Sequence, residues 1–262
     1  MRLKWYGAAT ILLEHDGSRL LFDPFLLRND AMVKPPIDEL SAVDTILVTH
    51  GHFDHIADTP AILAKGGGKA RVYCTAQPRK ALMAMGVEER LIHQVSPGDS
   101  FTIGSFAVRV RKGKHIVFDG LLVMRKLFSL NVIRYWGNLI KIFREHRKCP
   151  ESGETVAFDI CVNDKRILLL GSLNLDDGTD YPKGADLLIT PFQGRSDIQR
   201  YAVSIIDRLL PKKVLLTHFD DAYPPISSTV KTDCFLSRMT QKHPNTPVIC
   251  PHPGTAWIEI EW

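Results

Sequence analysis

Four side chains that can bind a metal ion crowd into six residues of this chain, at His50, His52, Asp54 and His55. An apolar run at residues 43–49 comes immediately before them and is typical of a short buried strand. A loop at the end of such a strand can present several side chains to one point. Imidazole and carboxylate groups are ligands that zinc takes, and they also suit iron and manganese. The segment therefore predicts a metal centre at one end of a sheet.

The short spacing limits how these four groups are used. They cannot all reach one ion from so short a loop, so we expect His50 and His52 to serve one ion. Alternation then turns Asp54 and His55 toward another ion. Gly51 supplies the backbone freedom that the close approach of its neighbours needs. Three imidazoles and a carboxylate this close together are hard to explain by packing alone.

Short apolar runs separated by turn residues recur along the chain in two successive blocks. They predict strands at residues 2–7, 10–14, 19–23, 43–49, 70–74, 101–103, 106–111, 155–163, 166–170, 186–190, 213–217, 248–250 and 255–261. Helices are predicted between them, at residues 59–65, 77–85, 198–210 and 230–243. This order indicates an α+β fold in which two mixed sheets pack face to face and helices cover the outside.

The composition and the course of the chain agree with a single domain. The 262 residues are 45% hydrophobic and 24% charged, the balance of a globular protein with a sizeable core. No low-complexity linker divides them, so we expect one domain over residues 1–262. We see no secretory signal and no apolar run of about 18 residues, and we expect a cytoplasmic protein. Free thiols are expected at Cys74, Cys149, Cys161, Cys234 and Cys250.

Positive charge is concentrated in residues 121–148. This segment holds seven basic side chains and one acidic one, so it carries +6 while the rest of the chain carries −2. A nucleic-acid-binding protein would spread such charge over a face of the fold, so we expect no nucleic-acid partner. The pattern predicts an amphipathic helix. Its apolar face would hold Val132, Tyr135, Trp136, Leu139 and Phe143, and its polar face Asn131, Arg134, Asn138, Lys141, Glu145 and Lys148.

Two interpretations of this segment remain open. The helix can pack on the core and leave a solvated basic face. Alternatively, residues 119–150 form an inserted lid beside the metal centre, where they line an apolar substrate pocket or touch an anionic membrane surface.

The motif His50-x-His52-x-Asp54-His55 resembles the signature of the metallo-β-lactamase superfamily. The stretches Trp5-Tyr6-Gly7 and Asp23-Pro24-Phe25 are similar to the branch that contains the ascorbate-phosphate lactonases and many uncharacterised hydrolases. The resemblance covers most of the chain and implies a four-layer αββα sandwich. It implies that Asp23 is the first conserved acid, which supports the metal loop. It also identifies His115 as the third histidine of the first metal and His218 as the last histidine of the second.

The chain departs from the family at Ser172. The family places a metal-bridging aspartate there, whereas this chain reads Gly171-Ser172-Leu173-Asn174, as in a subgroup with a Gly-Ser-x-Asn sequence. Without that acid, each ion still keeps three ligands. The first ion keeps His50, His52 and His115, and the second keeps Asp54, His55 and His218. Repulsion between the ions is less neutralised, so the second binds more weakly and anionic substrates are favoured. We expect one or two divalent ions, zinc first, with manganese or iron as alternatives.

These features predict a hydrolase that uses metal-bound hydroxide on an ester, a lactone or a phosphodiester. Asp54 and His218 are the expected catalytic residues, with Asp54 orienting the nucleophile. Further candidates near the substrate are Asp23, Ser172, Asn174, Arg195 (an anion contact) and Tyr223 (a proton source, with Asp220 and Asp221 as weaker ones). The expected partner is a small molecule with an apolar part, and a homo-oligomer is compatible with the sequence. The alternatives are a noncatalytic ligand-binding member of the fold and a metal oxidoreductase.

We expect the remaining histidines not to be metal ligands. His93 lies in a strand-like run and is expected to be a half-buried core residue. We expect His15 to lie in a hairpin turn, His146 and His243 to be solvated, and His252 to lie in a loop that could approach the site.

Overall fold

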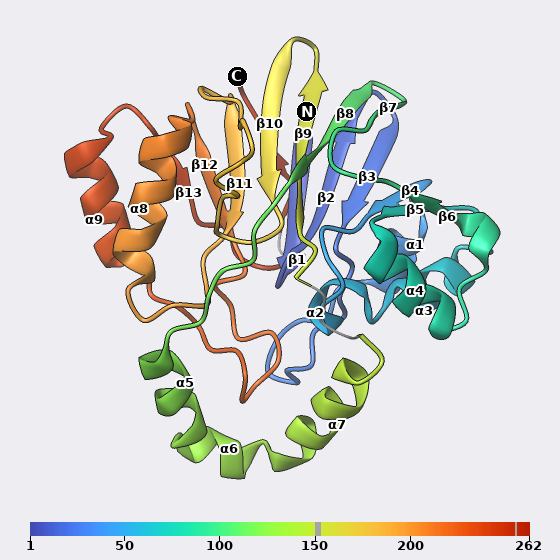
Figure 1. Cartoon of the computed structure of the whole chain (residues 1–262), viewed down its shortest axis with the longest axis horizontal. Coiled ribbons are helices and arrows are strands. Elements are labelled where there is room, and N and C mark those ends of the chain that lie inside the picture. Colours follow the sequence, from blue (N-terminus) through green and yellow to red (C-terminus); the bar gives the residue numbers. More distant parts are fainter. Residues whose placement is uncertain (150–152, 255) are drawn as a thin grey trace.

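Two seven-stranded sheets lie face to face at the centre of the computed structural model (Figure 1). The structure describes residues 1–149, 153–254 and 256–262, without the side chains of residues 123, 125 and 127. Residue 150 of the predicted insertion, residue 255 of the last predicted strand and the Arg125 side chain therefore lie outside the described part of the chain. Helices α1 (Ile37–Ser41), α3 (Thr59–Lys65) and α4 (Ala76–Ala84) flank one sheet. Helices α8 (Ile198–Leu209) and α9 (Asp233–Lys242) flank the other, so the layers follow the predicted αββα order.

The first sheet has the strand order β14-β1-β2-β3-β4-β5-β6. Its strands are β1 (Arg2–Gly7), β2 (Thr10–His15), β3 (Ser18–Phe22), β4 (Thr45–Leu47), β5 (Arg71–Cys74), β6 (Ile92–Gln94) and β14 (Ile258–Glu259). Strands β3 to β6 pair in parallel, and the others pair antiparallel.

The second sheet has the order β13-β12-β11-β10-β9-β8-β7. Its strands are β7 (Ser100–Ile103), β8 (Phe106–Lys112), β9 (Val156–Val162), β10 (Lys165–Leu170), β11 (Leu187–Pro191), β12 (Val214–Thr217) and β13 (Val248–Ile249). Strands β10 to β13 are parallel and β7 to β10 antiparallel. Both sheets are thus mixed, as the sequence predicts.

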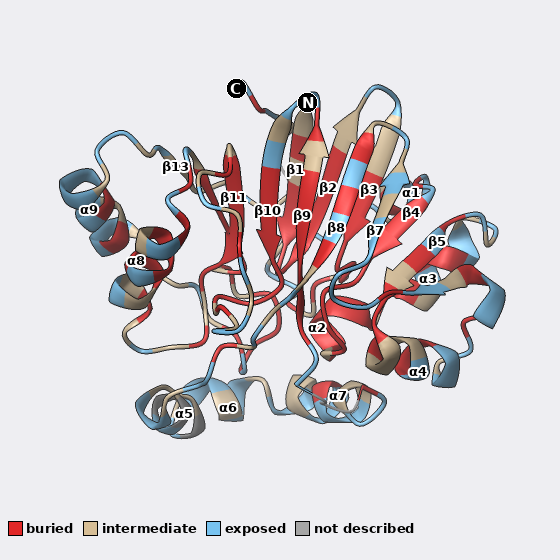
Figure 2. Ribbon diagram, turned by 45° about the horizontal axis from the view of Figure 1, so that its top comes forward, coloured by how far each residue is buried: buried red, intermediate tan, exposed pale blue. Residues whose placement is uncertain are grey.

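Three apolar clusters hold the layers together. The central cluster joins the inner faces of the two sheets and includes Trp5, Phe22 and Phe158, all of which are fully buried. An outer cluster packs the first sheet against its helices, α1 (Ile37–Ser41), α3 (Thr59–Lys65) and α4 (Ala76–Ala84). The other packs the second sheet against α8 (Ile198–Leu209) and α9 (Asp233–Lys242). Figure 2 shows the buried strands between partly exposed helices.

The basic segment forms three short helices rather than one long one. They are α5 (Gly120–Leu127), α6 (Leu130–Arg134) and α7 (Trp136–His146), which form an arc below both sheets (Figures 1 and 2). Asp119 caps α5 by accepting from the backbone N–H of Leu122 at 3.0 Å. Ser129 likewise caps α6.

The predicted faces of this segment were wrong in part: Lys141 and Lys148 are exposed as expected, but other positions differ. Trp136 and Phe143, which we assigned to the buried face, are exposed. Asn138 and Glu145, which we assigned to the solvated face, turn inward to the backbone oxygen and the guanidinium of Arg28. The inward polar side chains have a specific cationic partner in a distant loop, and periodicity alone does not reveal such a partner.

Other predicted elements agree with the structure within a few residues. The short helices α2 (Phe53–Ile56) and α1 and the 3₁₀ turn at Glu89–Leu91 were not predicted. His93 is exposed rather than half-buried, because β6 lies at the edge of its sheet. All five cysteines are free. No helix among the described residues is long and apolar enough to cross a membrane.

Candidate metal centre

The metal-binding candidates gather where strands end. Asp23 follows β3, His50 lies just beyond β4, His115 follows β8 and His218 follows β12. Since β3 and β4 are parallel, as are β10, β11 and β12, the carboxyl ends of these strands meet at one edge of the sandwich. His52 is the N-cap of α2. The motif therefore continues into a helical turn, and that turn directs the side chains after His52 differently from those before it.

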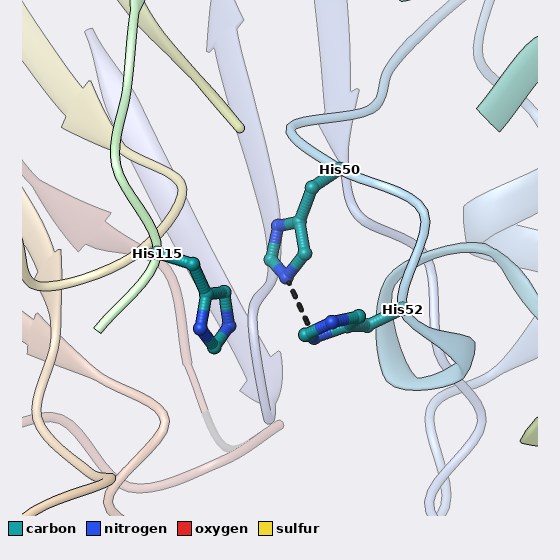
Figure 3. A group of neighbouring side chains, drawn as sticks. All are labelled: His50, His52 and His115. Carbon is teal, nitrogen blue, oxygen red and sulfur yellow. Dashed lines mark hydrogen bonds between the residues drawn. The ribbon is translucent and has the colours of Figure 1, made fainter. Parts of the chain in front are cut away.

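The first group contains His50, His52 and His115 (Figure 3). One ring nitrogen of each lies within 4.8 Å of the others. His50 Nε2 and His52 Nδ1 are 3.2 Å apart. The ring centroid of His115 is 4.6 Å from that of His52 and 5.2 Å from that of His50.

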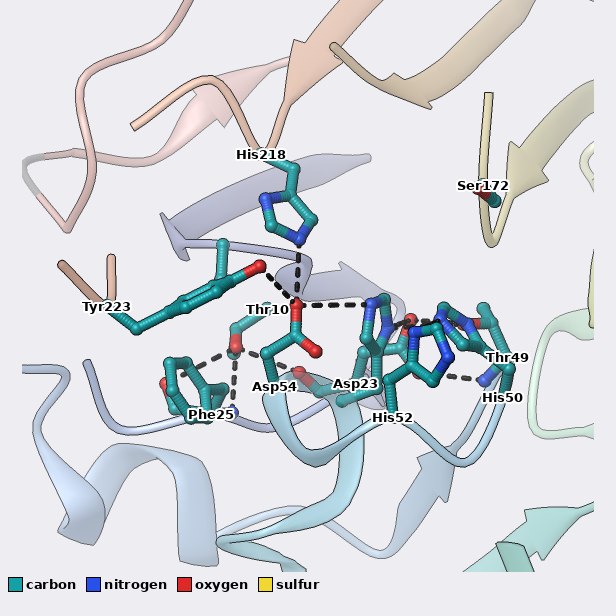
Figure 4. Close-up of polar contacts among 12 residues, drawn as sticks. Thr10, Asp23, Phe25, Thr49, His50, His52, Asp54, Ser172, His218 and Tyr223 are labelled. Atoms are coloured by element: carbon teal, nitrogen blue, oxygen red, sulfur yellow. Dashed lines mark hydrogen bonds and ion pairs between the residues drawn. The ribbon is translucent and has the colours of Figure 1, made fainter. Parts of the chain in front are cut away.

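The second group contains Asp54, His55 and His218 (Figure 4). All three are buried, and their ligand atoms also lie within 4.8 Å of one another. Asp54 Oδ2 is 3.0 Å from His218 Nε2 and 3.7 Å from His55 Nε2, and it accepts from the Tyr223 hydroxyl at 2.9 Å. The rings of His50 and His55 are 3.8 Å apart between centroids, so the two groups adjoin.

Asp23 and Thr49 orient the histidines of both groups. The Asp23 carboxylate accepts from the backbone N–H and from the hydroxyl of Thr49, both at 2.7 Å, and it lies 2.9 Å from His55 Nδ1. The Thr49 hydroxyl donates to Asp23, so its oxygen is left to accept from His50 Nδ1 at 3.0 Å. The His50 ring then carries its proton on Nδ1 and keeps the lone pair on Nε2, which is the form that binds a metal. Burial lowers the pKa of His55, but Asp23 and Asp54 outweigh it and raise that pKa, so a bound ion would replace the proton on Nε2 of this ring while Asp23 holds the one on Nδ1.

The Gly-Ser-x-Asn stretch holds the peptide bond after His115. Ser172 Oγ accepts from the Ile116 N–H at 2.9 Å, and Asn174 Nδ2 donates to the His115 carbonyl oxygen at 3.0 Å. Tyr201 donates to Asn174 Oδ1 at 2.8 Å and fixes the amide. His115 Nδ1 is 2.8 Å from the Ile116 carbonyl oxygen, which places the ring proton on Nδ1.

Burial and neighbouring charge set the protonation states. Burial, and then the charges of His55, His52 and His115, hold the pKa of His50 well below its usual value, so this ring is neutral. Burial alone would raise the pKa of Asp54, but His55 and the bond from His218 outweigh it and lower that pKa well below its usual value. Burial and Asp54 raise the pKa of Tyr223 well above its usual value, so the phenol keeps its proton.

These donors fit a divalent cation. Neutral imidazoles and an ionised carboxylate are the ligand forms that zinc and similar ions require. The buried Nδ1 of His218 has no hydrogen-bond partner among the described residues, and unpaired buried polar atoms are costly. His50 and His52 direct ring nitrogens at each other, so a cation between them would bind both in place of a shared proton.

Both groups open into one cavity of about 250 Å³. Apolar side chains form its outer wall, contributed by Phe53, Ile116, Phe118, Ile142, Phe143 and Ile226. His146, which we expected to be solvated, also lines it. The cavity therefore has polar donors at its base and an apolar mouth beside α7.

Some candidates do not reach this cavity. Arg195 forms an ion pair with Asp197 at 2.6 Å and is not among the lining residues. Asp220 accepts from the Ala8 N–H at 2.9 Å, and Asp221 accepts from the Ser227 hydroxyl at 2.7 Å, so both support loops. The exposed His252 also lies outside the lining.

Sequence reasoning missed Thr49 and the apolar lining. Thr49 directly precedes the motif, and a hydroxyl at that place is the one signal that could have revealed it. Phe118 and Ile226 lie far from each other in the chain, and only folding brings them together. His146 could have been found only by knowing which face of α7 turns inward.

Comparisons with known proteins agree with this architecture. Residues 18–123 match the family model described as the beta-lactamase superfamily domain. A UPF0173 metal-dependent hydrolase of Carboxydothermus hydrogenoformans is 36% identical over 116 residues, which cover 44% of this chain and 48% of that relative. The chain thus spans about half the length of the first such relative. A UPF0173 protein of Pyrococcus abyssi is 26% identical over 227 residues, covering 84% of this chain and 83% of its own.

Among solved structures, Igni18, a metallo hydrolase from Ignicoccus hospitalis, is similar over 99% of both chains, with a TM-score of 0.65 and 16% identity. At this identity the likeness concerns the fold. Together these findings define one class: residues 18–123 are similar to the beta-lactamase superfamily domain, and the fold of the chain is similar to that of this metallo hydrolase. Within that class, the sequence relatives that it resembles carry the UPF0173 name.

Proposed function

We propose that this protein is a metal-dependent hydrolase. The observation that carries the proposal is the pair of three-residue donor groups at the base of one cavity. The UPF0173 relatives named as metal-dependent hydrolases support it. The first ion would be held by His50, His52 and His115, and a second by Asp54, His55 and His218.

A bound divalent ion supplies Lewis acidity and lowers the pKa of coordinated water. The protein's own groups prepare the rest of the site. Asp23 and Thr49 hold His50 and His55 in the ligand tautomer. Tyr223, which keeps its proton, lines the cavity and donates to Asp54 Oδ2 at 2.9 Å; once an ion takes up Asp54, this O–H would be the donor that stabilises negative charge on a substrate oxygen. Asp54 and His218 are the proposed catalytic pair at the second ion.

Zinc is the metal we propose. The two groups together contain five imidazoles and a single carboxylate. Imidazole-rich sites suit zinc, whereas magnesium and calcium sites are built from oxygen ligands. With Ser172 in place of the bridging acid, only Asp54 offsets the charge of two ions, so we propose that the second ion binds more weakly than the first.

The cavity favours a substrate with two unlike ends. Its base would carry excess positive charge once metal is bound, which suits a carboxylate, lactone or phosphate group. Its outer wall is apolar, with Phe118, Ile142 and Phe143 on the side of the lid. We propose an ester, lactone or phosphodiester that carries an apolar group, and residues 119–149 as a lid inserted in a single domain.

The donor set weighs against the alternatives. A di-iron oxidoreductase needs bridging carboxylates, and among the described residues the two groups offer only Asp54. A noncatalytic member would have no need for six oriented ligands.

Metal analysis of the purified protein tests the proposal, with His52→Ala as the variant and His93→Ala, an exposed histidine on β6, as its control. We expect one to two zinc ions per chain in the wild type and in His93→Ala, and a loss in His52→Ala. The same three proteins are then assayed on nitrophenyl esters, lactones and bis-nitrophenyl phosphate. Protein that binds no metal in the presence of excess ions, or hydrolysis equal in all three, would overturn the proposal.

A further inference from the structure

Large apolar side chains are exposed along α5, α6 and α7. Phe128, Leu130 and Ile133 are 80%, 82% and 77% exposed. The arc and the turn before it expose further ones, at Val117, Phe118, Leu121, Met124, Trp136, Ile140 and Phe143. Away from the arc and the cavity, exposed apolar side chains of the described chain occur at Val33, Met83, Leu210 and Trp262. An apolar patch of this extent marks an interaction surface.

The last helix of the arc, α7, exposes both an apolar face and a basic face. Trp136, Ile140 and Phe143 recur at spacings of four and three, so they share one exposed face of α7. Lys141 and Arg144, spaced by three, share the adjoining exposed face, and the exposed Lys148 follows in the turn after the helix. The inward face carries Ile142 and the side chains that bind Arg28. Neither outward face is used for packing within the described fold.

The exposed charge on the arc has one sign. Its exposed cations are Arg134, Lys141, Arg144, Arg147 and Lys148. The arc's single acid, Glu145, is half-buried and pairs with Arg28 at 3.2 Å. Two such arcs would repel each other, which disfavours a second copy as the occupant. An anionic surface complements both the cations and the apolar side chains between them.

The patch is continuous with the cavity above the metal centre. Phe118, Phe143 and Ile226 are exposed, and they also line the cavity. The His115 ring lies 5.8 Å from the Phe118 ring, so the apolar mouth reaches the first donor group. An apolar chain could therefore contact apolar side chains along its way from the patch to the donors.

The fold holds the arc in place. Asp119 accepts from the N–H and the hydroxyl of Ser196, at 2.6 and 2.9 Å. Lys126 donates to the Ser228 hydroxyl at 2.6 Å. At the other end, Arg28 bridges Asp58 and Glu145. The exposed side chains are thus presented by an anchored element, which reduces the ordering cost of binding a surface.

We propose that α5–α7 dock on the surface of an anionic lipid bilayer, with the cavity mouth facing the lipids. The substrate class, which rests on the proposed hydrolase function, is then an amphiphilic ester or phosphodiester that the protein takes from that bilayer. The exposed apolar side chains would enter the boundary between headgroups and acyl chains, and the exposed cations would contact the headgroups.

Vesicle co-sedimentation tests the surface. The wild type is compared on neutral phosphatidylcholine vesicles and on vesicles with roughly 30% phosphatidylglycerol. One variant carries Phe128→Ser, Leu130→Ser and Ile133→Ser, and a second carries Lys141→Gln, Arg144→Gln and Lys148→Gln. The matched control carries Met83→Ser, Leu210→Ser and Trp262→Ser, which are exposed apolar positions outside the arc. Thermal unfolding confirms that each protein is folded.

We expect the wild type and the control to bind anionic vesicles at least about tenfold more tightly than neutral ones, and both arc variants to lose about tenfold or more. Unbound wild type, or arc variants that bind as well as the control, would overturn the proposal. A dimer in size-exclusion chromatography that the serine variant converts to a monomer, without vesicle binding, would identify a second copy as the occupant.

A variant of the first donor group separates this result from the proposed function. The His52→Ala variant keeps the whole arc, so we expect it to bind vesicles like the wild type even when it hydrolyses nothing. If it binds and the wild type is inactive on every ester tested, docking stands and the hydrolase proposal fails. If the wild type hydrolyses soluble esters but binds no vesicle, docking fails and the hydrolase proposal stands.

Discussion

The metal centre and the α5–α7 arc face the same cavity but differ in how their side chains are used. At the metal centre, neighbouring side chains orient donor rings, as Asp23 from the end of β3 holds His55 and Thr49 holds the adjacent His50. On the arc, the largest apolar side chains contact little of the protein. The difference teaches that the first region is organised for reaction geometry and the second for contact with something outside the chain. Changes in the two regions should therefore have separable effects.

The largest effect confined to one of the two regions is expected from Asp54→Asn, at the metal centre. This change keeps the shape of the side chain but removes the single carboxylate of the two donor groups. We expect kcat/KM to fall by about 10²–10³-fold, the size of effect that the loss of one strong electrostatic group produces. Steady-state kinetics and metal analysis measure it.

The control for this change is Asp16→Asn, in the exposed turn between β2 and β3, where asparagine tolerates the positive φ. Vesicle binding should be the same for both variants. An Asp54→Asn enzyme that retained full activity would show that chemistry does not depend on the second donor group.

A smaller effect is expected from Ser172→Ala. It leaves the buried N–H of Ile116 without its acceptor and loosens the peptide bond next to His115. We expect metal affinity to fall by roughly 10–100-fold, as for other residues that orient a ligand. Competition with a chelating dye measures the dissociation constant, and Ser204→Ala, an exposed serine on α8, is the control. Equal affinities would mean that Ser172 does not position His115.

On the arc, Arg28→Ala should loosen α7 while leaving the donors intact. Arg28 is half-buried between Asp58 and Glu145. Burial alone would lower the pKa of its guanidinium, but the two acids outweigh burial and raise that pKa. We expect amides of α7 to exchange faster, with a loss of about 1–2 kcal/mol in local opening free energy. Hydrogen exchange measures this, with Arg90→Ala as the exposed control. Faster exchange at α2 as well would show that the two regions are not separable.

The smallest effect concerns pH. Burial lowers the pKa of Lys126 to about 8, so the folded protein holds fewer protons on this amine than the unfolded chain above that pH. The free-energy cost of burying the charged amine is fully present below pH 8. This cost is relieved as pH rises from about 8 toward the ordinary pKa of lysine. We expect Lys126→Met to stabilise the fold most below pH 8 and to lose that advantage as pH rises. Denaturant unfolding of both proteins at several pH values measures the difference, and a difference constant with pH would contradict it.

The same contrast explains what the sequence could reveal. The strand ends and the motif from His50 to His55 are local patterns, so they were predicted from the residues themselves. His115 and His218 were placed by the family resemblance alone, because their neighbourhood depends on how two sheets meet. The αββα order followed from the run of strands and helices, which the layer rules restrict to few arrangements.

The arc could not be predicted because its periodicity admits more than one inward face. The helix turned Asn138 and Glu145 inward to reach Arg28, more than a hundred residues away in the chain. Hydrophobic periodicity assigns the apolar side to the core, and it fails where another apolar environment is available. The role of Ser172 also depended on a long-range contact, the N–H of Ile116.

The clamp on the peptide bond after His115 has a mechanical consequence. That peptide bond lies four positions before Asp119, where α5 is capped and anchored to Ser196. Ser172 and Asn174 therefore hold the chain between α5 and His115, so a displacement of α5 on docking would be stopped at this clamp before it reached the ligand. By thermodynamic linkage, a site isolated in this way would bind metal with equal affinity whether the arc is occupied or free.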